Sequence, residues 1–370
     1  MTSTVYLNHA GTSWPKPPEV HAAVADALTA DPARWPGLFD EARAEVARFF
    51  GARDPETVVI TPGCTSALAV ALADLPWEAG DRLIIGGLEH HALHRPALAL
   101  ARTRGVELLV APYAPGAPLD LDFVERALKA GGVRLLAFAM ASNVTGELAP
   151  ARELAALARR YGARCLVDAA QAAGVVEVDV RELDVDLLAF AGHKGPLGPQ
   201  GVGGLYIAPD LPMRALSANC GGAQACVLGD MFQPGYCDLG SVNYAGLAGL
   251  AAGLRWIRAQ GLARLRARTL ARTRQLLEGV AAIPGARVIG CDRAEARAPV
   301  VSFVLEGDAP EVIATRLRAR HGVVVRAGLQ CAPLAHATLG TAAGGTVRAS
   351  VGASTEPEDV AALLDALAER

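Results

Sequence analysis

The sequence predicts an α/β fold, with a mostly parallel central sheet in a large domain and a smaller α/β domain at the C-terminus. Through the middle of the chain, short apolar runs alternate with helical patterns, which is typical of a parallel sheet covered by helices on both faces. After about residue 280 the pattern changes to a shorter mix of strands and helices. A chain of 370 residues, 52% of them hydrophobic, is large enough to bury both cores.

The apolar runs are interpreted as strands and the longer periodic stretches between them as helices. In the first part, the predicted strands are 57–61, 82–86, 106–110, 133–139, 164–168, 185–190 and 202–207. The predicted helices are 65–75, 92–104, 122–129 and 150–161, followed by a long helical region over 244–280. In the second part we expect strands at 299–305, 323–325 and 346–350, and helices at 310–321 and 356–369.

These elements predict two domains, with the boundary inside the long helical region near residue 255. Residues 21–255 form the large domain and residues 256–370 the small one. We expect residues 1–20 to return and pack on the small domain. In parallel sheets ligands bind at the carboxyl ends of the strands, so we look there for functional residues.

Composition excludes several classes of function. The formal net charge is −3 and the pI about 6.3, so there is no basic excess for a nucleic-acid backbone. No apolar stretch is long enough to cross a membrane, and the N-terminus does not resemble a signal peptide, so we expect a soluble, cytoplasmic protein. The seven cysteines are odd in number and form no C-x-x-C pair, which argues against a disulfide framework and a structural zinc site.

Lys194 is one of only three lysines, with Lys16 and Lys129, and it follows an apolar strand in the glycine-rich segment Gly192-His193-Lys194-Gly195. A lysine that forms an imine must be reachable and partly desolvated. Gly192 and Gly195 would let the backbone approach a bulky ligand. The alternative is a surface turn with a solvated lysine.

Asp168 ends the next candidate, the buried strand at 164–168. A carboxylate in this place can keep a pyridine nitrogen protonated, which makes the ring an electron sink. Gln171, three residues on, is placed to donate to a hydroxyl on such a ring. The alternative is that Asp168 caps the following helix.

Two further segments follow strands. Gly63-Cys64-Thr65 opens a helix, and backbone N–H groups with hydroxyls at a helix N-terminus bind phosphate. An ordinary N-cap by Thr65 or Ser66 is the alternative. His90 belongs to a histidine-rich segment with His91 and His94. Without acidic or cysteine ligands at a suitable spacing a metal site is not expected, and we predict that His90 stacks on a flat ring while the other two are helix residues.

Together these residues supply phosphate donors, a stacking group, a carboxylate and an imine lysine at the ends of separate strands. At this point the chain resembles the class V aminotransferase group of fold type I pyridoxal-phosphate (PLP) enzymes, and within it the cysteine desulfurase and selenocysteine lyase branch. The segments that carry the resemblance are Val5–Pro15, Glu89–Ala92, Ser142–Gly146, Val167–Gln171, Gly192–Lys194, Val325–Leu334 and Thr346–Ser350.

The resemblance implies a role for each matching residue. PLP would be held as an imine on Lys194, beneath His90, with its ring nitrogen on Asp168. Gln171 and Asn143 would contact the ring hydroxyl or the substrate. Gly63, Cys64, Thr65 and His193 would hold the phosphate, completed by Gly240 and Ser241 of a neighbouring subunit, which implies a homodimer with shared active sites. Arg348 would bind the substrate carboxylate, with Arg326 nearby, and Cys331 would be the nucleophile.

The expected reaction depends on the role of Cys331. It lies in a loop close in sequence to Arg326, and positive charge favours the reactive thiolate; the alternative is a small buried hydrophobic residue. We expect a PLP-dependent cysteine desulfurase that takes sulfur from L-cysteine as a persulfide on Cys331, releases L-alanine and passes the sulfur to an acceptor protein. Other PLP reactions stay open: selenocysteine lyase, C–S lyase on a modified cysteine, or an epimerase-like activity. So does a non-catalytic PLP-fold protein.

The chain departs from the family pattern at several positions. Asn8-His9 replaces Asp-Asn, Ala191 replaces Ser, and Ser241 stands where Thr is usual. Gln330 precedes Cys331 where His is common, and residues 352–355 lack the usual aromatic-Asn pair. We expect the changes at Gln330 and Ser354 to lie near the substrate.

Overall fold

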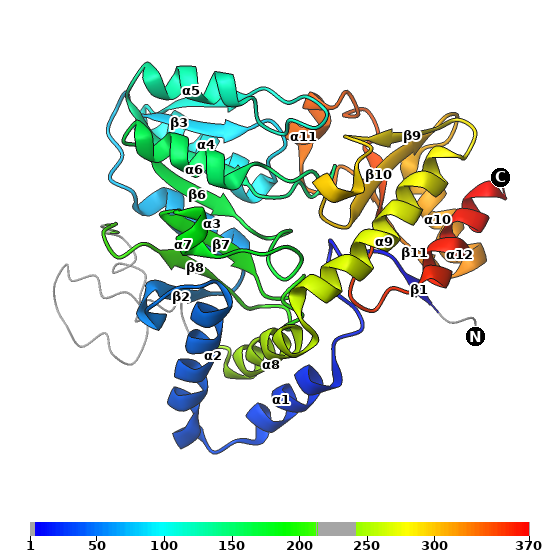
Figure 1. Ribbon diagram of the computed structural model, residues 1–370, viewed down its shortest axis with the longest axis horizontal. Helices are drawn as coiled ribbons and strands as arrows, with labels where there is room; N and C mark the ends of the chain where they lie inside the picture. Colours follow the sequence, from blue (N-terminus) through cyan, green and yellow to red (C-terminus); the bar gives the residue numbers. More distant parts are fainter. Residues whose placement is uncertain (1–3, 212, 214–241, 370) are drawn as a thin grey trace.

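The computed structural model describes residues 4–211, 213 and 242–369. Its main feature is a seven-stranded sheet in the order β2-β8-β7-β6-β5-β3-β4 (Figure 1). Strand β8 runs antiparallel to both of its neighbours, and the remaining pairs are parallel. The strands of this sheet are β2 (Val58–Thr61), β3 (Arg82–Gly86), β4 (Glu107–Ala111), β5 (Val133–Ala139), β6 (Arg164–Asp168), β7 (Leu187–Ala191) and β8 (Gly203–Ile207).

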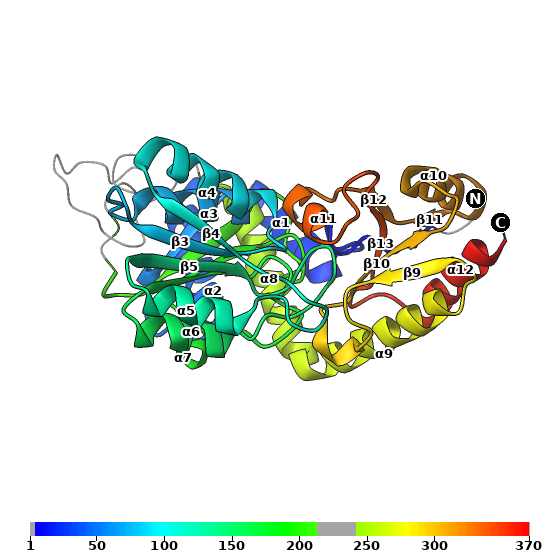
Figure 2. The same ribbon diagram turned by 90° about the horizontal axis from the view of Figure 1, so that it is seen from above.

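Helices cover both faces of this sheet (Figure 2). Helices α3 and α4 lie on one face, and α5, α6 and α7 on the other. The helices of this part of the chain are α1 (Pro18–Thr29), α2 (Trp35–Phe49), α3 (Cys64–Asp74), α4 (His91–Arg104), α5 (Leu121–Lys129), α6 (Ala151–Arg160), α7 (Val180–Leu183) and α8 (Tyr244–Gln260).

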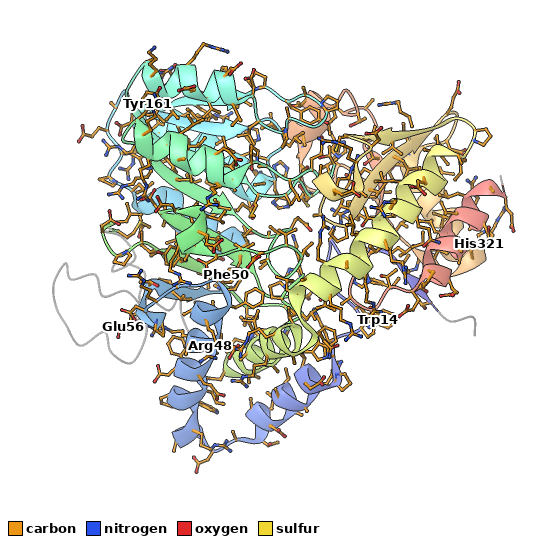
Figure 3. The ribbon with its side chains drawn as sticks, viewed as in Figure 1. Trp14, Arg48, Phe50, Glu56, Tyr161 and His321 are labelled. Carbon is orange, nitrogen blue, oxygen red and sulfur yellow. The ribbon has the colours of Figure 1, made fainter. Side chains whose placement is uncertain are left out.

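Successive side chains along each strand point to opposite faces of the sheet and so belong to two different hydrophobic cores. In β5, Leu136 and Phe138 belong to the core on one face of the sheet, whereas Leu135 and Ala137 belong to the core on the other. Both faces are therefore apolar, as the continuous apolar runs predict. Phe50, at the end of α2, joins the first of these cores with its ring 4.8 Å from that of Phe190 (Figure 3).

A second, four-stranded antiparallel sheet in the order β12-β13-β10-β9 has its own core. Helix α9 runs from the large sheet along this smaller one (Figure 1). The helices and strands in this second part of the chain are α9 (Leu262–Ala281), β9 (Ala286–Ile289), β10 (Val300–Leu305), α10 (Pro310–His321), β11 (Val323–Val324), β12 (Arg326–Gly328), α11 (Pro333–Thr338), β13 (Thr346–Ser350) and α12 (Pro357–Ala368).

The N-terminal segment crosses to this second sheet. Strand β1 (Val5–Tyr6) pairs in parallel with β11, and the fully buried Leu7 belongs to the core of the smaller sheet. These contacts match the expected path of the first residues, while the division of the chain at residue 255 stays a prediction.

The structure confirms the predicted α/β architecture and adds short elements that were not predicted, such as α7, β9, β12 and α11. It also differs from the prediction in two larger features. The helical region over 244–280 is two helices, because Gly261 adopts φ +80° and separates α8 from α9. Helices α1 and α2 have no counterpart among the predicted elements. They pack against α8, so their burial depends on a partner that is distant in sequence.

Candidate active site

A cavity of about 310 Å³ lies at the carboxyl ends of β5, β6 and β7, beside the start of α3. This is where a parallel sheet binds ligands, and the volume is in the range of small-molecule sites. Nine of the predicted residues line it: Gly63, Cys64, Thr65, His90, Asn143, Asp168, Gln171, His193 and Lys194.

Asp168 is the last residue of β6 and is only 4% exposed. Its Oδ1 accepts a hydrogen bond from the backbone N–H of Ala170 at 2.8 Å and from the thiol of Cys64 at 3.3 Å. Burial, and then the Asp168 charge, hold the pKa of Cys64 well above its usual value, so this thiol stays a neutral donor. Asp168 thus stabilises a turn and also faces the cavity.

The Cys64 contact limits the phosphate role expected for that residue to its backbone. Its side chain points to Asp168, so only its backbone N–H is available at the start of α3. A Cβ built on Gly63 would meet no atom within 4 Å, and the exposed Thr65 and half-buried Ser66 also line the cavity. The start of α3 therefore opens on the cavity as an anion site.

Lys194 lies in the loop after β7, between the side chains of the cavity. Burial lowers its pKa, while the charges of Asp168 and Cys64 raise it. The amine is therefore desolvated and close to Asp168, which excludes the solvated surface turn. The neighbouring glycines serve packing: a Cβ on Gly195 would lie 2.0 Å from the carbonyl oxygen of Ala173, and one on Gly192 would lie 2.8 Å from that of Val202. Close approach to protein backbone, not to a ligand, explains them.

The carbonyl of His193 ties this loop to the N-terminal segment. It accepts hydrogen bonds from Lys16 Nζ at 2.8 Å, from Thr12 Oγ1 at 3.1 Å, and from both the N–H and the hydroxyl of Ser13 at 3.1 Å. The imidazole Nδ1 lies 3.0 Å from Thr12 Oγ1. Burial lowers the pKa of His193 to about 4, so the ring is neutral at pH 7 and its other nitrogen is left for the cavity.

His90 is the N-cap of α4, where its Nδ1 accepts a hydrogen bond from the N–H of Ala92 at 3.0 Å. Burial lowers the pKa of His90 to about 4. The ring is therefore neutral at pH 7 with its proton on Nε2, and it presents a flat, uncharged surface to the cavity. His91 and His94 lie in α4, as predicted.

Asn143 and Gln171 are held by neighbouring segments. Asn143 Nδ2 donates to the carbonyl of Gln330 at 2.7 Å, and Gln171 Nε2 donates to the carbonyl of Ala10 at 2.9 Å. Both side chains are buried and both line the cavity. These bonds fix the two amides from the side of the small sheet and of the N-terminal segment.

Arg348, in β13, is a buried cation beside the cavity. Its Nη1 donates to the carbonyl of Asn143 at 2.9 Å and its Nη2 to Asn8 Oδ1 at 3.2 Å. Its buried Nε has no hydrogen-bond partner among the described residues. Burial, followed by the charge of Arg326, lowers its pKa to about 10. Arg348 does not itself line the cavity, but it contacts Asn143, which does, and its unpaired donor is a group that a carboxylate satisfies. Arg326 is the exposed cross-strand neighbour of Arg348.

Cys331 is exposed, in the turn before α11, which excludes the alternative of a buried hydrophobic residue. Its carbonyl accepts from the N–H of His91 at 2.8 Å, so the turn lies against the start of α4, beside His90. Burial lowers the pKa of both Lys194 and Arg348, and Cys331 is among the groups that act against this effect, so the thiol lies within electrostatic range of the two cations.

The expectation that Gln330 and Ser354 lie near the substrate stays a prediction, and neither side chain faces the cavity. The side chain of Gln330 is buried and bonded to Thr346 and His336, away from the cavity. Ser354 is exposed, and its hydroxyl donates to the carbonyl of Trp14 at 3.5 Å. Neither residue lines the cavity. Gly240 and Ser241 lie outside the described residues.

Sequence patterns missed several groups that the structure brings to the site. Asn8 orients Arg348, Lys16 binds the loop of Lys194, and Ser66 and Gln200 line the cavity. The sequence did mark Asn8, because it is one of the departures from the family pattern. Within the described part of the chain, no cluster of His, Cys, Asp or Glu is arranged to hold a metal ion, and no helix is long and apolar enough to span a membrane.

Comparisons with known proteins agree with this geometry. The family model described as aminotransferase class-V matches residues 5–363. A cysteine desulfurase from Synechococcus elongatus is 36% identical over 81% of this chain, and a probable cysteine desulfurase from Methanothermobacter thermautotrophicus is 32% identical over 89% of it. A solved apo structure of a cysteine desulfurase from Thermococcus onnurineus, 30% identical, matches with a TM-score of 0.90 over 99% of this chain and 94% of that one.

The extent of the matches differs between relatives. The chain spans about half the length of the Synechococcus protein and of a probable cysteine desulfurase from Mycolicibacterium paratuberculosis, 48% and 47% respectively. It covers 82% of the Methanothermobacter protein.

The cavity fits the cofactor that the family match implies, pyridoxal 5'-phosphate. It combines a desolvated amine, a carboxylate, a neutral imidazole and an open helix N-terminus, which are the groups needed by an aldehyde, a pyridine nitrogen, an aromatic ring and a phosphate. The likeness to the Thermococcus structure confirms the fold type I architecture. The chain belongs to the class-V aminotransferase family of PLP enzymes.

Proposed function

We propose that the protein is a PLP-dependent cysteine desulfurase, which transfers the sulfur of L-cysteine to Cys331 and releases L-alanine. The observation that carries this proposal is the position of Cys331. Its thiol is exposed, lies in a turn bound to the start of α4, and is within electrostatic range of Lys194 and Arg348. The relatives named as cysteine desulfurases support the same reaction.

Different residues bind the substrate carboxylate, the cofactor aldehyde, the phosphate and the ring. Arg348, with its free Nε, binds the substrate carboxylate, which places the thiol of the substrate near Cys331. Lys194 attaches the cofactor and moves protons, because its desolvated amine has a lowered pKa. The start of α3 with Thr65 and His193 binds the phosphate. Asn143 and Gln171 orient the ring or the substrate, and His90 stacks on the ring.

The sulfur transfer balances without an external oxidant. PLP, when bound with its nitrogen paired to Asp168, supplies the electron sink that makes the substrate reactive. The Cys331 thiolate attacks the substrate sulfur, so an S–S bond forms at Cys331 while the carbon–sulfur bond of the substrate breaks. The carbon skeleton keeps that electron pair, takes up a proton and leaves as alanine. The persulfide on Cys331 then carries the sulfur.

Several parts of this proposal rest on the family resemblance. A homodimer would complete the phosphate site with Gly240 and Ser241 of the second subunit. A sulfur-acceptor protein would take the sulfur from Cys331, and the exposure of this residue supports such access. A cytoplasmic location and the division into domains at 21–255 and 256–370 are also part of the proposal, and they rest on the sequence patterns.

The test is product analysis with L-cysteine and a reductant. We expect alanine and sulfide from the wild type, and neither from Cys331→Ser. Cys291→Ser is the matched control, because Cys291 is a buried cysteine that does not line the cavity. Full activity of Cys331→Ser would contradict the persulfide step. Release of pyruvate in place of alanine would point to C–S lyase chemistry. A parallel assay with selenocysteine as substrate tests the selenocysteine lyase alternative.

A further inference from the structure

The turn that carries Cys331 has a strained backbone. Gln330 has φ +42° and Cys331 has φ +59°, so two consecutive residues with side chains lie in the left-handed region. Residues other than glycine seldom adopt this conformation, and when they do the surrounding structure must hold them there. Such strain concentrates at functional sites, so the contacts of this turn show what holds the thiol in place.

The side-chain amide of Gln330 is anchored in the small sheet. Its Nε2 donates to the carbonyl of Thr346 at 2.7 Å, and its Oε1 accepts from the hydroxyl of Thr346 at 3.2 Å. The same Oε1 lies 2.8 Å from Nε2 of His336. Gln330 is 5% exposed and the other two residues are fully buried, so water does not compete for these bonds.

His336 has a defined hydrogen-bonding state in this network. Because Gln330 uses its nitrogen to donate to Thr346, its Oε1 must accept, so His336 Nε2 carries a proton. Nδ1 of His336 lies 2.7 Å from Thr341 Oγ1, which can donate to it. Burial lowers the pKa of His336, so this neutral tautomer holds at pH 7. Every polar group of the amide and of the ring thereby has a partner.

The backbone of the same turn is bound to two segments that follow strands of the large sheet, the turn after β5 and the start of α4. The carbonyl of Gln330 accepts from Asn143 Nδ2 at 2.7 Å, and the carbonyl of Cys331 accepts from the N–H of His91 at 2.8 Å. Asn143 lines the cavity, and His91 follows the proposed stacking residue His90. The turn is thus held on one side by the Gln330 amide, which is bonded to the small sheet. On the other side it is held by the carbonyls of Gln330 and Cys331, which are bonded to Asn143 and His91.

We infer that Gln330, anchored by His336 and Thr346, is a positioning residue that holds the left-handed turn and so directs the thiol of Cys331 to the substrate. This inference rests on the proposed function, because it takes Cys331 as the nucleophile. It also gives Gln330 a role that differs from substrate contact, although it replaces the histidine common in the family. The amide does not line the cavity and is bonded to Thr346 and His336, so it acts through the backbone that it shares with Cys331.

The test uses Gln330→Ala with the matched pairs Thr346→Val and Thr346→Ser, and His336→Leu and His336→Gln. Removing an anchor should lower kcat about 10- to 100-fold, because a thiol displaced by about 1 Å loses its reactive geometry. KM for cysteine should change less than about threefold, since Arg348 is untouched. Thr346→Ser keeps the hydroxyl and His336→Gln keeps a donor for Oε1, so each should recover most of the loss seen in its partner.

A second readout needs no turnover. The rate at which iodoacetamide alkylates Cys331 in the holoenzyme, followed by mass spectrometry of the peptide that contains it, should change in Gln330→Ala. Combining Gln330→Ala with His336→Leu should cost no more than the larger single effect, because both remove the same anchor. Additive losses, or an unchanged kcat and alkylation rate in Gln330→Ala, would overturn the inference. If Gln330→Ala does not fold, the pair His336→Leu and His336→Gln, which removes and then restores a donor to Oε1, decides the same question.

These outcomes separate the inference from the proposed function. If Cys331→Ser abolishes alanine release while the Gln330, His336 and Thr346 variants keep kcat, only the positioning role fails. If Cys331→Ser keeps full activity, the proposed function fails, and the alkylation rates still report whether Gln330 controls the thiol.

Discussion

Glu89 is a buried carboxyl whose protonation should govern the stability of the cofactor-free protein. It lies next to His90, is 2% exposed, and its two oxygens accept from the N–H of Ala139 at 3.0 and 3.2 Å. Burial, opposed by the Ala139 hydrogen bond and assisted by the charge of Asp168, raises its pKa from 4.5 to about 8. The folded protein thus holds a proton on Glu89 that the unfolded chain releases above pH 4.5.

The sign of the pH dependence follows. Stability from this group is complete below the unfolded pKa of 4.5 and is lost as the pH rises toward the folded pKa of about 8. Between the two pKa values, each pH unit changes the free energy of unfolding by about 1.4 kcal/mol. The stability lost between pH 5 and pH 8 is therefore about 3 kcal/mol. Glu89→Gln removes the titration while keeping the shape and one acceptor for Ala139.

The assay is thermal unfolding of both proteins, without cofactor, at pH 5 and pH 8. We expect Glu89→Gln to gain about 3 kcal/mol relative to the wild type between these two pH values, and the other titrating groups cancel in the difference. Glu56→Gln, on an exposed glutamate (Figure 3), controls for the loss of a charge. A difference between Glu89→Gln and wild type that is the same at both pH values, or that falls with pH, would refute the reasoning.

Three further variants test the site and its support. Asp168→Asn should keep the absorbance of bound cofactor but lower turnover about 100-fold or more, because a neutral amide cannot stabilise a protonated ring nitrogen; unchanged turnover would contradict this. Arg348→Lys should raise KM for cysteine at least about tenfold, since lysine lacks the planar fork, and an unchanged KM would remove Arg348 from the carboxylate site. Arg297 is fully buried and donates to the carbonyls of Thr145, Ile289 and Cys291. Arg297→Leu should therefore lower the free energy of unfolding in urea by about 3 kcal/mol or more, and a loss below about 1 kcal/mol would contradict it.

The sequence patterns predicted most of the fold because its strands are buried on both faces. Predicted and observed bounds agree for β3, β5, β6 and β13, and the apolar runs of β3, β6 and β13 end at a polar or glycine residue. The break at Gly261 was missed because a glycine inside a helical pattern is tolerated in many helices, and only its φ of +80° separates α8 from α9. Helices α1 and α2 were missed because their burial comes from α8, far along the chain.

At the site, sequence matching predicted which residues come together but not where each side chain points. Cys64 follows the glycine of the phosphate segment, yet its thiol binds Asp168. Gln330 precedes the nucleophile, yet its amide turns into the small sheet, because the left-handed backbone reverses the direction of the side chain. Such directions depend on φ angles and on partners such as His336, which no local motif contains.

The attachment of the cofactor is the central claim, and the chain allows a direct measurement because it has three lysines. Borohydride reduction of the holoenzyme, followed by peptide mass spectrometry, identifies the lysine that carries the pyridoxyl group. We predict the label on Lys194, whose amine is desolvated beside Asp168, and loss of the label in Lys194→Ala. A label on Lys16 or Lys129, or no label on any lysine of the reduced holoenzyme, would contradict the account.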